Sequence, residues 1–318
     1  MTFSIVIPAY NGEKYVEKAI LSALNQTRKP DEIIVHDDNS NDTTRQICEK
    51  YSKEIAYYFN KDGPSGFVNG WKRAILLAKS EFVAILHQDD LLYPTFLEEA
   101  EQALTLNPDI KHLFALCDYI QEEDLITSSG ESAILNGVKS AKLIRYSGQA
   151  YAKAYQKNYN GIPHIHRCPG VITQRMIFEN ECNYIIEAGH IADDDFFYRV
   201  GQYTPVIGIM KSLAAFRIHP GSETGSIGKI NLVKRLADDY IYQVKQWQNS
   251  NFLDEKDKFY FEYWAIKYLF QLFVYAFKAS NKEKKKNAEL LYQEFKLLKL
   301  SNGHFKELLK LKIARIIS

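Results

Sequence analysis

Two apolar runs of strand type, residues 32–35 and 82–86, are each followed by a pair of aspartates. The pairs are Asp37 with Asp38 and Asp89 with Asp90. Ligands of open α/β sheets bind beyond the carboxyl ends of the strands, where carboxylates can hold a divalent cation together with phosphate groups. One such pair is usually a solvated turn or a helix cap. Two pairs at the same sheet edge, with the glycine-containing loop 60–66 between them, favour a polar ligand site.

The first hundred residues alternate between strand and helix patterns. Strands are predicted at 3–7, 32–35, 55–59 and 82–86, where short runs suited to strands stop at polar or turn-forming residues. After residue 12, apolar side chains recur at helical spacing and predict one buried helix face. These side chains belong to Val16, Ala19, Ile20, Ala23 and Leu24. The order of the elements predicts a right-handed βαβ unit in a parallel sheet.

Composition narrows the class of protein. The 318 residues suffice for a large core in one or two domains, and a net charge of +1 gives no field that would attract nucleic acid. The four cysteines lack CxxC spacing, so we expect neither a disulfide framework nor a zinc site, and a reducing cytoplasmic location fits. We expect no signal peptide, and no apolar run approaches the ~20 residues that span a bilayer. Neither GxGxxG nor a Walker lysine loop occurs, which disfavours dinucleotide and P-loop binding.

Three segments carry a resemblance to a known family. Residues 4–11, 22–27 and 34–43 together resemble the start of family 2 glycosyltransferases, and the resemblance continues with gaps to about residue 222. It implies the α/β GT-A fold, in which a Rossmann-like, mostly parallel sheet is flanked by helices. It also implies transfer of a sugar from a nucleotide-diphosphate sugar, with inversion at the anomeric carbon.

The resemblance assigns the donor site residue by residue. Asp38 matches the acid that binds the base, typically N3–H of uracil, and Asp89 and Asp90 match the acids that bind Mn²⁺ or Mg²⁺ and the ribose. His87 stands where the family has its first aspartate; it is a metal ligand or, as we favour, a packed residue at the strand end. The remaining expected contacts to the nucleoside, ribose and diphosphate are Pro8, Ala9, Tyr10, Gly63, Ser65, Gly66 and Asn69.

The acceptor half is expected to supply a general base. In the family, an acid before an aromatic helix takes the proton of the acceptor hydroxyl. Counting back from Arg199 gives Asp193, and Asp194 is the competing choice because Ala192 replaces the family's preceding glutamate. A simpler interpretation is that the three consecutive acids stabilise a helix N-terminus. Three exceed what capping requires, so we favour the catalytic interpretation.

Two further segments bring histidines toward the expected site. Residues 215–222 resemble the family's Arg-x-His segment, in which Arg217 or His219 would face the diphosphate or the metal. A purely structural histidine before a proline is an equal alternative for His219. In the segment 163–172, His164 and His166 would share one strand face, where polar or acceptor contacts are favoured over metal binding.

The chain divides in sequence into a catalytic domain at 1–225, with a nucleotide-sugar half at 1–100 and an acceptor half at 101–225, and a helical region at 226–318. Between residues 282 and 318 there are ten Lys or Arg and four Asp or Glu residues, a balance of +6.

Two segments of the helical region are expected to contact other surfaces. An aromatic-rich segment at 259–277 is expected to pack on the catalytic domain, with a lipid chain or a second subunit of a homo-oligomer as alternatives. The basic amphipathic tail at 282–318 could lie on an anionic surface at the inner face of the cell membrane, although packing on the protein body is the commoner fate of such a stripe.

The resemblance, together with these features, predicts a metal-dependent glycosyltransferase that uses a nucleotide-diphosphate sugar, foremost a UDP-sugar. The expected acceptor is a saccharide or lipid-linked saccharide in cell-surface polysaccharide biosynthesis. One alternative is a nucleotide-sugar or carbohydrate-binding protein of the same fold whose chemistry is degraded. A phosphotransferase with Asp37 or Asp38 as nucleophile is less favoured, because residues 38–40 lack the Asp-x-Asp pattern that such chemistry usually needs.

Overall fold

The computed structural model describes residues 1–133, 142–158 and 168–222, together with short stretches between residues 238 and 268. The chain forms two compact units, one of Met1–Glu187 with Ala192–Ser222, the other of Ala188–Ile191 with Glu223–Ser318. Within the second unit, residues 241–247 and 265–268 are helical. His164, His166, most of the aromatic segment and the whole basic tail lie outside the described residues.

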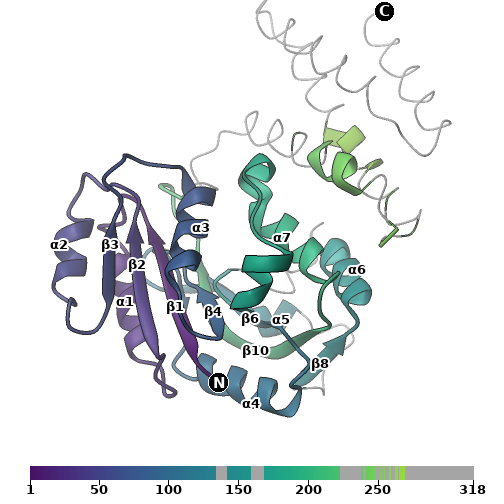
Figure 1. The fold of residues 1–318 in the computed structure, drawn as a ribbon, viewed down its shortest axis with the longest axis horizontal. Helices are drawn as coiled ribbons and strands as arrows, with labels where there is room; N and C mark the ends of the chain where they lie inside the picture. The colour runs from purple at the N-terminus through teal and green to yellow at the C-terminus, as the bar shows by residue number, and fades with distance from the viewer. Residues whose placement is uncertain are drawn as a thin grey trace, which may run out of the picture. The chain divides into compact units, whose positions relative to one another are not determined.

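Ten strands of the described residues form one sheet in the order β3-β2-β1-β4-β9-β6-β10-β5, with β7 beside β6 and β8 beside β10 (Figure 1). The strands are β1 (Phe3–Ala9), β2 (Glu32–Asp37), β3 (Ala56–Phe59), β4 (Phe82–Ile85), β5 (Leu91–Leu92), β6 (His112–Ile120), β7 (Ile126–Ser128), β8 (Leu143–Tyr146), β9 (Val171–Gln174) and β10 (Val206–Arg217). The helices are α1 (Val16–Leu24), α2 (Thr44–Glu49), α3 (Phe67–Leu77), α4 (Phe96–Leu106), α5 (Gly130–Ala133), α6 (Gly148–Asn158) and α7 (Ala192–Val200), with the short helical segments η1 (Ile177–Glu181) and η2 (Ile186–Ile191).

The first half of the sheet is parallel and the second half is mixed. Strand β1 pairs in parallel with β2 and β4, and β2 pairs in parallel with β3. Strand β9 runs antiparallel to both β4 and β6, and so joins the two halves. Strands β6 and β10 are again parallel, which brings their carboxyl ends to one edge. The predicted parallel sheet therefore describes the nucleotide half, whereas antiparallel pairs of β9, β5, β7 and β8 complete the other half.

Helix α1 illustrates how local sequence determines packing. Its buried residues Val16, Ala19, Ile20 and Ala23 are four of the five predicted for the apolar face, and Leu24 is partly buried against the same core. Helices α1, α2 and α3 pack against strands β1 and β2, and α4 packs against β10. Helix α3 begins at Phe67, directly after Gly66, whose φ of 87° is in the left-handed region that suits glycine.

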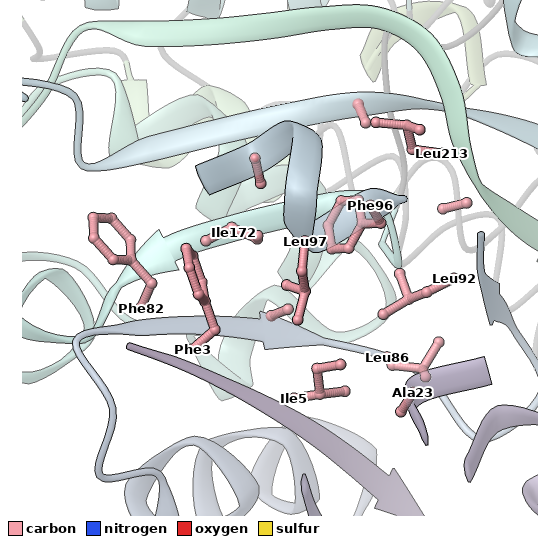
Figure 2. Close-up of a cluster of buried hydrophobic side chains, with 14 of the residues drawn as sticks. Phe3, Ile5, Ala23, Phe82, Leu86, Leu92, Phe96, Leu97, Ile172 and Leu213 are labelled. Atoms are coloured by element: carbon pink, nitrogen blue, oxygen red, sulfur yellow. The ribbon is translucent and has the colours of Figure 1, made fainter. Parts of the chain in front are cut away.

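The hydrophobic core joins the two halves of the sheet. Figure 2 shows Phe3 of β1, Phe82 of β4 and Ile172 of β9 in one cluster with Phe96 and Leu97 of α4. All five side chains are buried, and each buried apolar side chain of this size stabilises the fold by about 1.5–3 kcal/mol. The core therefore fixes α4 and β9 against the nucleotide half, and it holds the strand ends in register.

Strand β10 is irregular in a way that matters for the site. Its pairing with β6 shifts between Ile209 and Ser212 and again between Ser212 and Ala214, as in a β-bulge. Bulges bend a strand and redirect the side chains that follow. Beyond the bulge, Ala215 lies beside Leu91 of β5, and the strand ends at Arg217. The bulge thus precedes the segment of β10 that reaches the ends of β4 and β6.

The four cysteines are free thiols and all are buried. No helix among the described residues combines the length and apolar character that crossing a bilayer requires.

A buried histidine gives the fold a predictable acid sensitivity. Burial lowers the pKa of His112 from 6.5 to about 3, and its Nδ1 lies 2.8 Å from Thr173 Oγ1. The neutral imidazole is favoured in the folded state, so its stability contribution is complete above pH 6.5 and is lost as the pH falls toward 3. We expect the unfolding free energy to fall over that range by up to ~1.4 kcal/mol per pH unit from this residue.

Urea unfolding followed by fluorescence at several pH values measures this slope. Substitution His112→Asn removes the titrating ring, so the variant should be less stable at neutral pH but lose less stability on acidification. Burial also lowers the pKa of His36 and His87, so some slope should remain. If the unfolding free energies of the wild-type protein and the variant fell equally with pH, the role given to His112 would be contradicted.

Candidate functional site

Asp38 lies at the carboxyl end of β2, where the sequence predicts a contact to the nucleotide base. Its N–H donates to the carbonyl of Ala9 at 2.8 Å, which fixes it beside the end of β1. Its Oδ1 accepts from Asn60 Nδ2 at 2.7 Å and from Ser65 Oγ at 2.9 Å, and its Oδ2 accepts from Ser65 N–H at 2.7 Å. A carboxylate has about four acceptor sites, so these three bonds leave Oδ2 with capacity for one further donor.

The loop from residue 60 to residue 66 gathers the other predicted donor contacts around Asp38. The Asn60 side chain also donates to the carbonyl of Gly63 at 2.7 Å, and Asn69 Nδ2 donates to the carbonyl of Ser65 at 2.9 Å. Gly63 has a φ of 88°, in the left-handed region where glycine is unstrained. The structure therefore brings Gly63, Ser65 and Asn69 together at Asp38.

Asp37 has a different environment from its neighbour. Its Oδ1 accepts from Ser40 N–H and its Oδ2 accepts from the Tyr57 hydroxyl, both at 2.7 Å, and the side chain is fully buried. Burial and this bond to Asp37 raise the pKa of Tyr57. Both oxygens of Asp37 thus hold the strand-end turn to β3, which gives this carboxylate a structural role.

Pro8 and Ala9 are the last residues of β1, and Tyr10 follows them at the surface. Gln88, which was not among the expected site residues, connects Tyr10 to the acidic segment after β4 through hydrogen bonds. Tyr10 N–H donates to Gln88 Oε1 at 2.8 Å, and Gln88 Nε2 donates to the carbonyl of Tyr10 at 3.1 Å. A Cβ on Gly12 would lie 2.2 Å from Gln88 Oε1, so glycine lets this side chain approach.

Asp89 and Asp90, the acid pair, lie in the turn after β4. Asp90 is buried, and its Oδ1 accepts from the backbone N–H of Arg217 at 2.8 Å. Its Oδ2 is buried and has no hydrogen-bond partner among the residues that the structure describes. Burial and the charge of Asp89 raise the pKa of Asp90 well above its usual range, against the opposing effect of Arg217. Asp89 Oδ2 lies 3.1 Å from His219 Nε2, so the predicted pair and His219 are neighbours.

Arg217 is fully buried beside the acid pair. Its Nε donates to the carbonyl of Asp89 and its Nη1 to that of Gln121, both at 2.7 Å. Its Nη2 pairs with Asp124 Oδ1 at 2.5 Å, and the guanidinium lies 4.7 Å from the Tyr15 ring centroid. The resemblance implied that Arg217 or His219 faces the diphosphate or the metal; in the structure, backbone carbonyls and Asp124 engage the guanidinium of Arg217.

Mn²⁺ or Mg²⁺ at the acid pair is the cofactor that the sequence predicts. Within the described ranges, no three His, Cys, Asp or Glu side chains converge in a way that could hold a metal ion. The buried, unpartnered Asp90 Oδ2 nevertheless fits a cation that takes its remaining ligands elsewhere. Mg²⁺ in particular is commonly bound by one or two carboxylates together with substrate phosphates.

The acids at the start of α7 have different neighbours, which can be identified from the groups that their charges affect. Burial lowers the pKa of His87, and the negative charges of Asp89 and Asp193 oppose that shift. Burial raises the pKa of the Cys168 thiol, and the charges of Asp193 and Asp90 add to the rise. The half-buried carboxylate of Asp193 therefore lies near the same two side chains as the acid pair.

Asp194 and Asp195 have other neighbours. Burial raises the pKa of Tyr151, and the charge of Asp194 adds to the rise, which places Asp194 near that ring. Asp195 is fully buried and pairs with Arg199, whose Nε and Nη2 lie 2.7 and 2.6 Å from Asp195 Oδ2. Of the three acids, Asp193 is thus the one associated with the acid pair.

His87 packs against a pair of aromatic side chains. Its imidazole stacks on Trp71 with ring centroids 4.8 Å apart, and Trp71 meets the edge of Tyr184 at 5.3 Å. His87 Nδ1 lies 3.7 Å from Asp90 Oδ2, which is too long for a hydrogen bond. Neither Trp71 nor Tyr184 is among the site residues expected from the sequence, because nothing in the local sequence marks which aromatic residues lie near a site.

The amino-acid sequence is similar to those of known proteins. Residues 4–168 match the sequence model of Glycosyl transferase family 2. A glycosyltransferase of Rickettsia typhi is 40% identical over 117 residues, which cover 36% of each chain. The GalNAc(5)-diNAcBac-PP-undecaprenol beta-1,3-glucosyltransferase of Campylobacter jejuni is 36% identical over 128 residues, or 38% of this chain and 40% of that enzyme. The matched segments thus span well under half the length of these relatives.

Solved structures support the fold. S. aureus TarS 1–349 in complex with UDP-GlcNAc superposes with a TM-score of 0.63 at 17% identity, over 92% of this chain and 79% of that one. The complex of the same protein with UDP gives a TM-score of 0.58 at 17% identity, over 90% and 78% of the two chains. The predicted GT-A fold is confirmed, and the family match over more than half of its residues shows that this chain belongs to glycosyl transferase family 2.

Proposed function

We propose that this protein transfers a hexosyl or related sugar from a nucleotide-diphosphate sugar, foremost a UDP-sugar, to a hydroxyl of a saccharide or lipid-linked saccharide. The named relatives support this direction. TarS was solved with UDP and with UDP-GlcNAc, and the name of the Campylobacter enzyme describes transfer of glucose to a glycan on an undecaprenol carrier. The pathway proposed is the synthesis of a cell-surface polysaccharide.

One observation carries the proposal, namely the interaction of His87 with both Asp193 and the acid pair. The charges of Asp89 and Asp193 both act on His87, and His87 Nδ1 lies 3.7 Å from Asp90 Oδ2. These interactions support Asp193 as a base for the acceptor hydroxyl, close to the acids proposed to face the donor diphosphate. Proximity of these two functions is what a direct displacement at the anomeric carbon requires.

In the proposed mechanism each of the acidic residues has a separate role. Asp38, with the loop that Ser65 and Asn60 hold against it, receives the base of the nucleotide. Asp89 and Asp90 would hold Mn²⁺ or Mg²⁺, which would supply Lewis-acid stabilisation of the negative charge on the leaving diphosphate. The Asp193 carboxylate accepts the proton of the acceptor hydroxyl while the new C–O bond forms. A single displacement of this kind inverts the anomeric carbon.

A second candidate, a nucleotide-sugar binder without catalysis, is favoured by one observation. His87 and Ala192 stand where the family has an aspartate and a glutamate, so two acids of the family pattern are missing. The phosphotransferase alternative receives no such support, because both oxygens of Asp37 are engaged by Ser40 and Tyr57.

The Asp193 assignment makes a sharp prediction. Substitution Asp193→Asn removes the base, so we expect UDP release from a UDP-sugar to slow by about 10²–10⁴-fold, while UDP affinity stays unchanged. The matched change Asp194→Asn, at the acid near Tyr151, should retain most of the activity. Steady-state assays with UDP-glucose and UDP-GlcNAc, with UDP affinity from calorimetry, measure both effects. A wild-type protein that binds UDP-sugars but never releases UDP would favour the binder.

Removal of the metal gives a second prediction. Chelation by EDTA should abolish UDP release, and added Mn²⁺ or Mg²⁺ should restore it, because the acid pair alone leaves the diphosphate charge unneutralised. The change Asp90→Asn, which removes the charge next to Arg217 N–H, should raise the cation concentration needed for half-maximal rate. Full activity in EDTA, confirmed by metal analysis of the sample, would contradict the role given to the cation.

We also propose that the protein works at the cytoplasmic face of the membrane and associates with it peripherally through the basic tail at 282–318. A lipid-linked acceptor would be presented at that surface. Charge reversal of Lys284, Lys285 and Lys286 to Glu in the full chain should reduce co-flotation with phosphatidylglycerol vesicles, because each basic residue near an anionic surface contributes about 1 kcal/mol. The change Lys50→Glu, in the catalytic domain, is the control. Equal flotation of all three proteins would argue against the tail.

A further inference from the structure

Arg217 makes contacts that bridge three parts of the fold. The side chain is 1% exposed and ends strand β10. Its backbone N–H holds the side chain of Asp90, and its Nε holds the backbone carbonyl of Asp89. Two consecutive residues of the acidic turn are thus fixed by one residue, 127 and 128 positions later in the chain.

The far end of the guanidinium is anchored in the turn that follows β6. Nη1 donates to the carbonyl of Gln121 at 2.7 Å and Nη2 pairs with Asp124 Oδ1 at 2.5 Å. Asp124 has a φ of 61° and carries an outer ion pair with Lys18 at 2.7 Å. A buried guanidinium requires such partners, because an uncompensated buried charge is strongly destabilising. The turn is therefore part of the support of the acid pair.

The contacts avoid the oxygens that a ligand would need. Arg217 binds Asp90 through Oδ1 and Asp89 through its backbone carbonyl, and Asp90 Oδ2 has no hydrogen-bond partner in the described part of the chain. A lysine could not reproduce this arrangement, because its single ammonium cannot reach the Asp89 carbonyl and the 121–124 turn with the fixed fork of a guanidinium.

From these contacts we infer that Arg217 is a positioning residue, which sets the acid pair for the diphosphate and its cation without touching the donor. The inference rests on the proposed function. It separates Arg217 from the nucleoside pocket at Asp38, whose partners are Ala9, Asn60 and Ser65. Loss of Arg217 contacts should therefore weaken binding of the diphosphate while it spares binding of the nucleoside.

Calorimetry with uridine and with UDP, each in the presence of Mn²⁺, tests this separation. The change Arg217→Lys keeps the charge but loses the fork, so we expect UDP affinity to fall about 10- to 100-fold, as for partners that orient metal ligands. Uridine affinity should not change. The change Asp124→Asn, at a partly exposed partner, should lower UDP affinity about threefold. Arg145→Lys, in a surface pair with Asp109, is the matched control and should alter neither.

The measured affinities distinguish a positioning role of Arg217 from a general role in supporting the fold. Equal losses of uridine and UDP affinity would make Arg217 a general support of the fold, and unchanged UDP affinity in folded Arg217→Lys would remove its positioning role; either result overturns the inference. If Arg217→Lys does not fold, Asp124→Asn decides in the same way. A wild-type protein that binds neither uridine nor UDP would instead overturn the proposed function, and the inference with it.

Discussion

A buried positive charge at the end of β10 is the constraint around which this site is built. Arg217 could not be buried without partners, and it finds them in the acidic turn after β4 and in the turn after β6. The bulged pairing of β10 with β6 precedes the residue that must reach both turns. The same contacts that compensate the guanidinium therefore bring two aspartates to one sheet edge, where their mutual repulsion would otherwise disfavour them.

The sequence predicted the nucleotide half well because its signals are local. The apolar spacing of α1 and the short apolar strands follow from neighbours within a few residues, and parallel pairing then places Asp38 beside the end of β1. The contacts of Arg217 and Gln88 could not be predicted in this way, because each joins segments that are 78 to 128 residues apart. The antiparallel insertion of β9 between β4 and β6 is a similarly non-local feature.

Helix geometry explains why the three consecutive acids have different surroundings. Successive residues of an α-helix point about 100° apart, so Asp193, Asp194 and Asp195 cannot share one environment. One associates with the acid pair and His87, one with Tyr151, and one pairs with Arg199. A shift of one residue in the predicted register is enough to exchange these roles, and composition alone carries no information about that register.

The site contains buried polar atoms that a ligand could satisfy. Among the described residues, Asp90 Oδ2 and His87 Nε2 are both buried without hydrogen-bond partners, and each such group costs about 1–3 kcal/mol. Burial also shifts the pKa of Asp90 upward and that of His87 downward, toward the neutral forms. A ligand that supplies positive charge or hydrogen bonds here binds only the folded chain, and so stabilises it in proportion to its affinity. The unsatisfied atoms therefore express a compromise, in which some stability of the free protein is given up for an arrangement of acids that is set before the donor arrives.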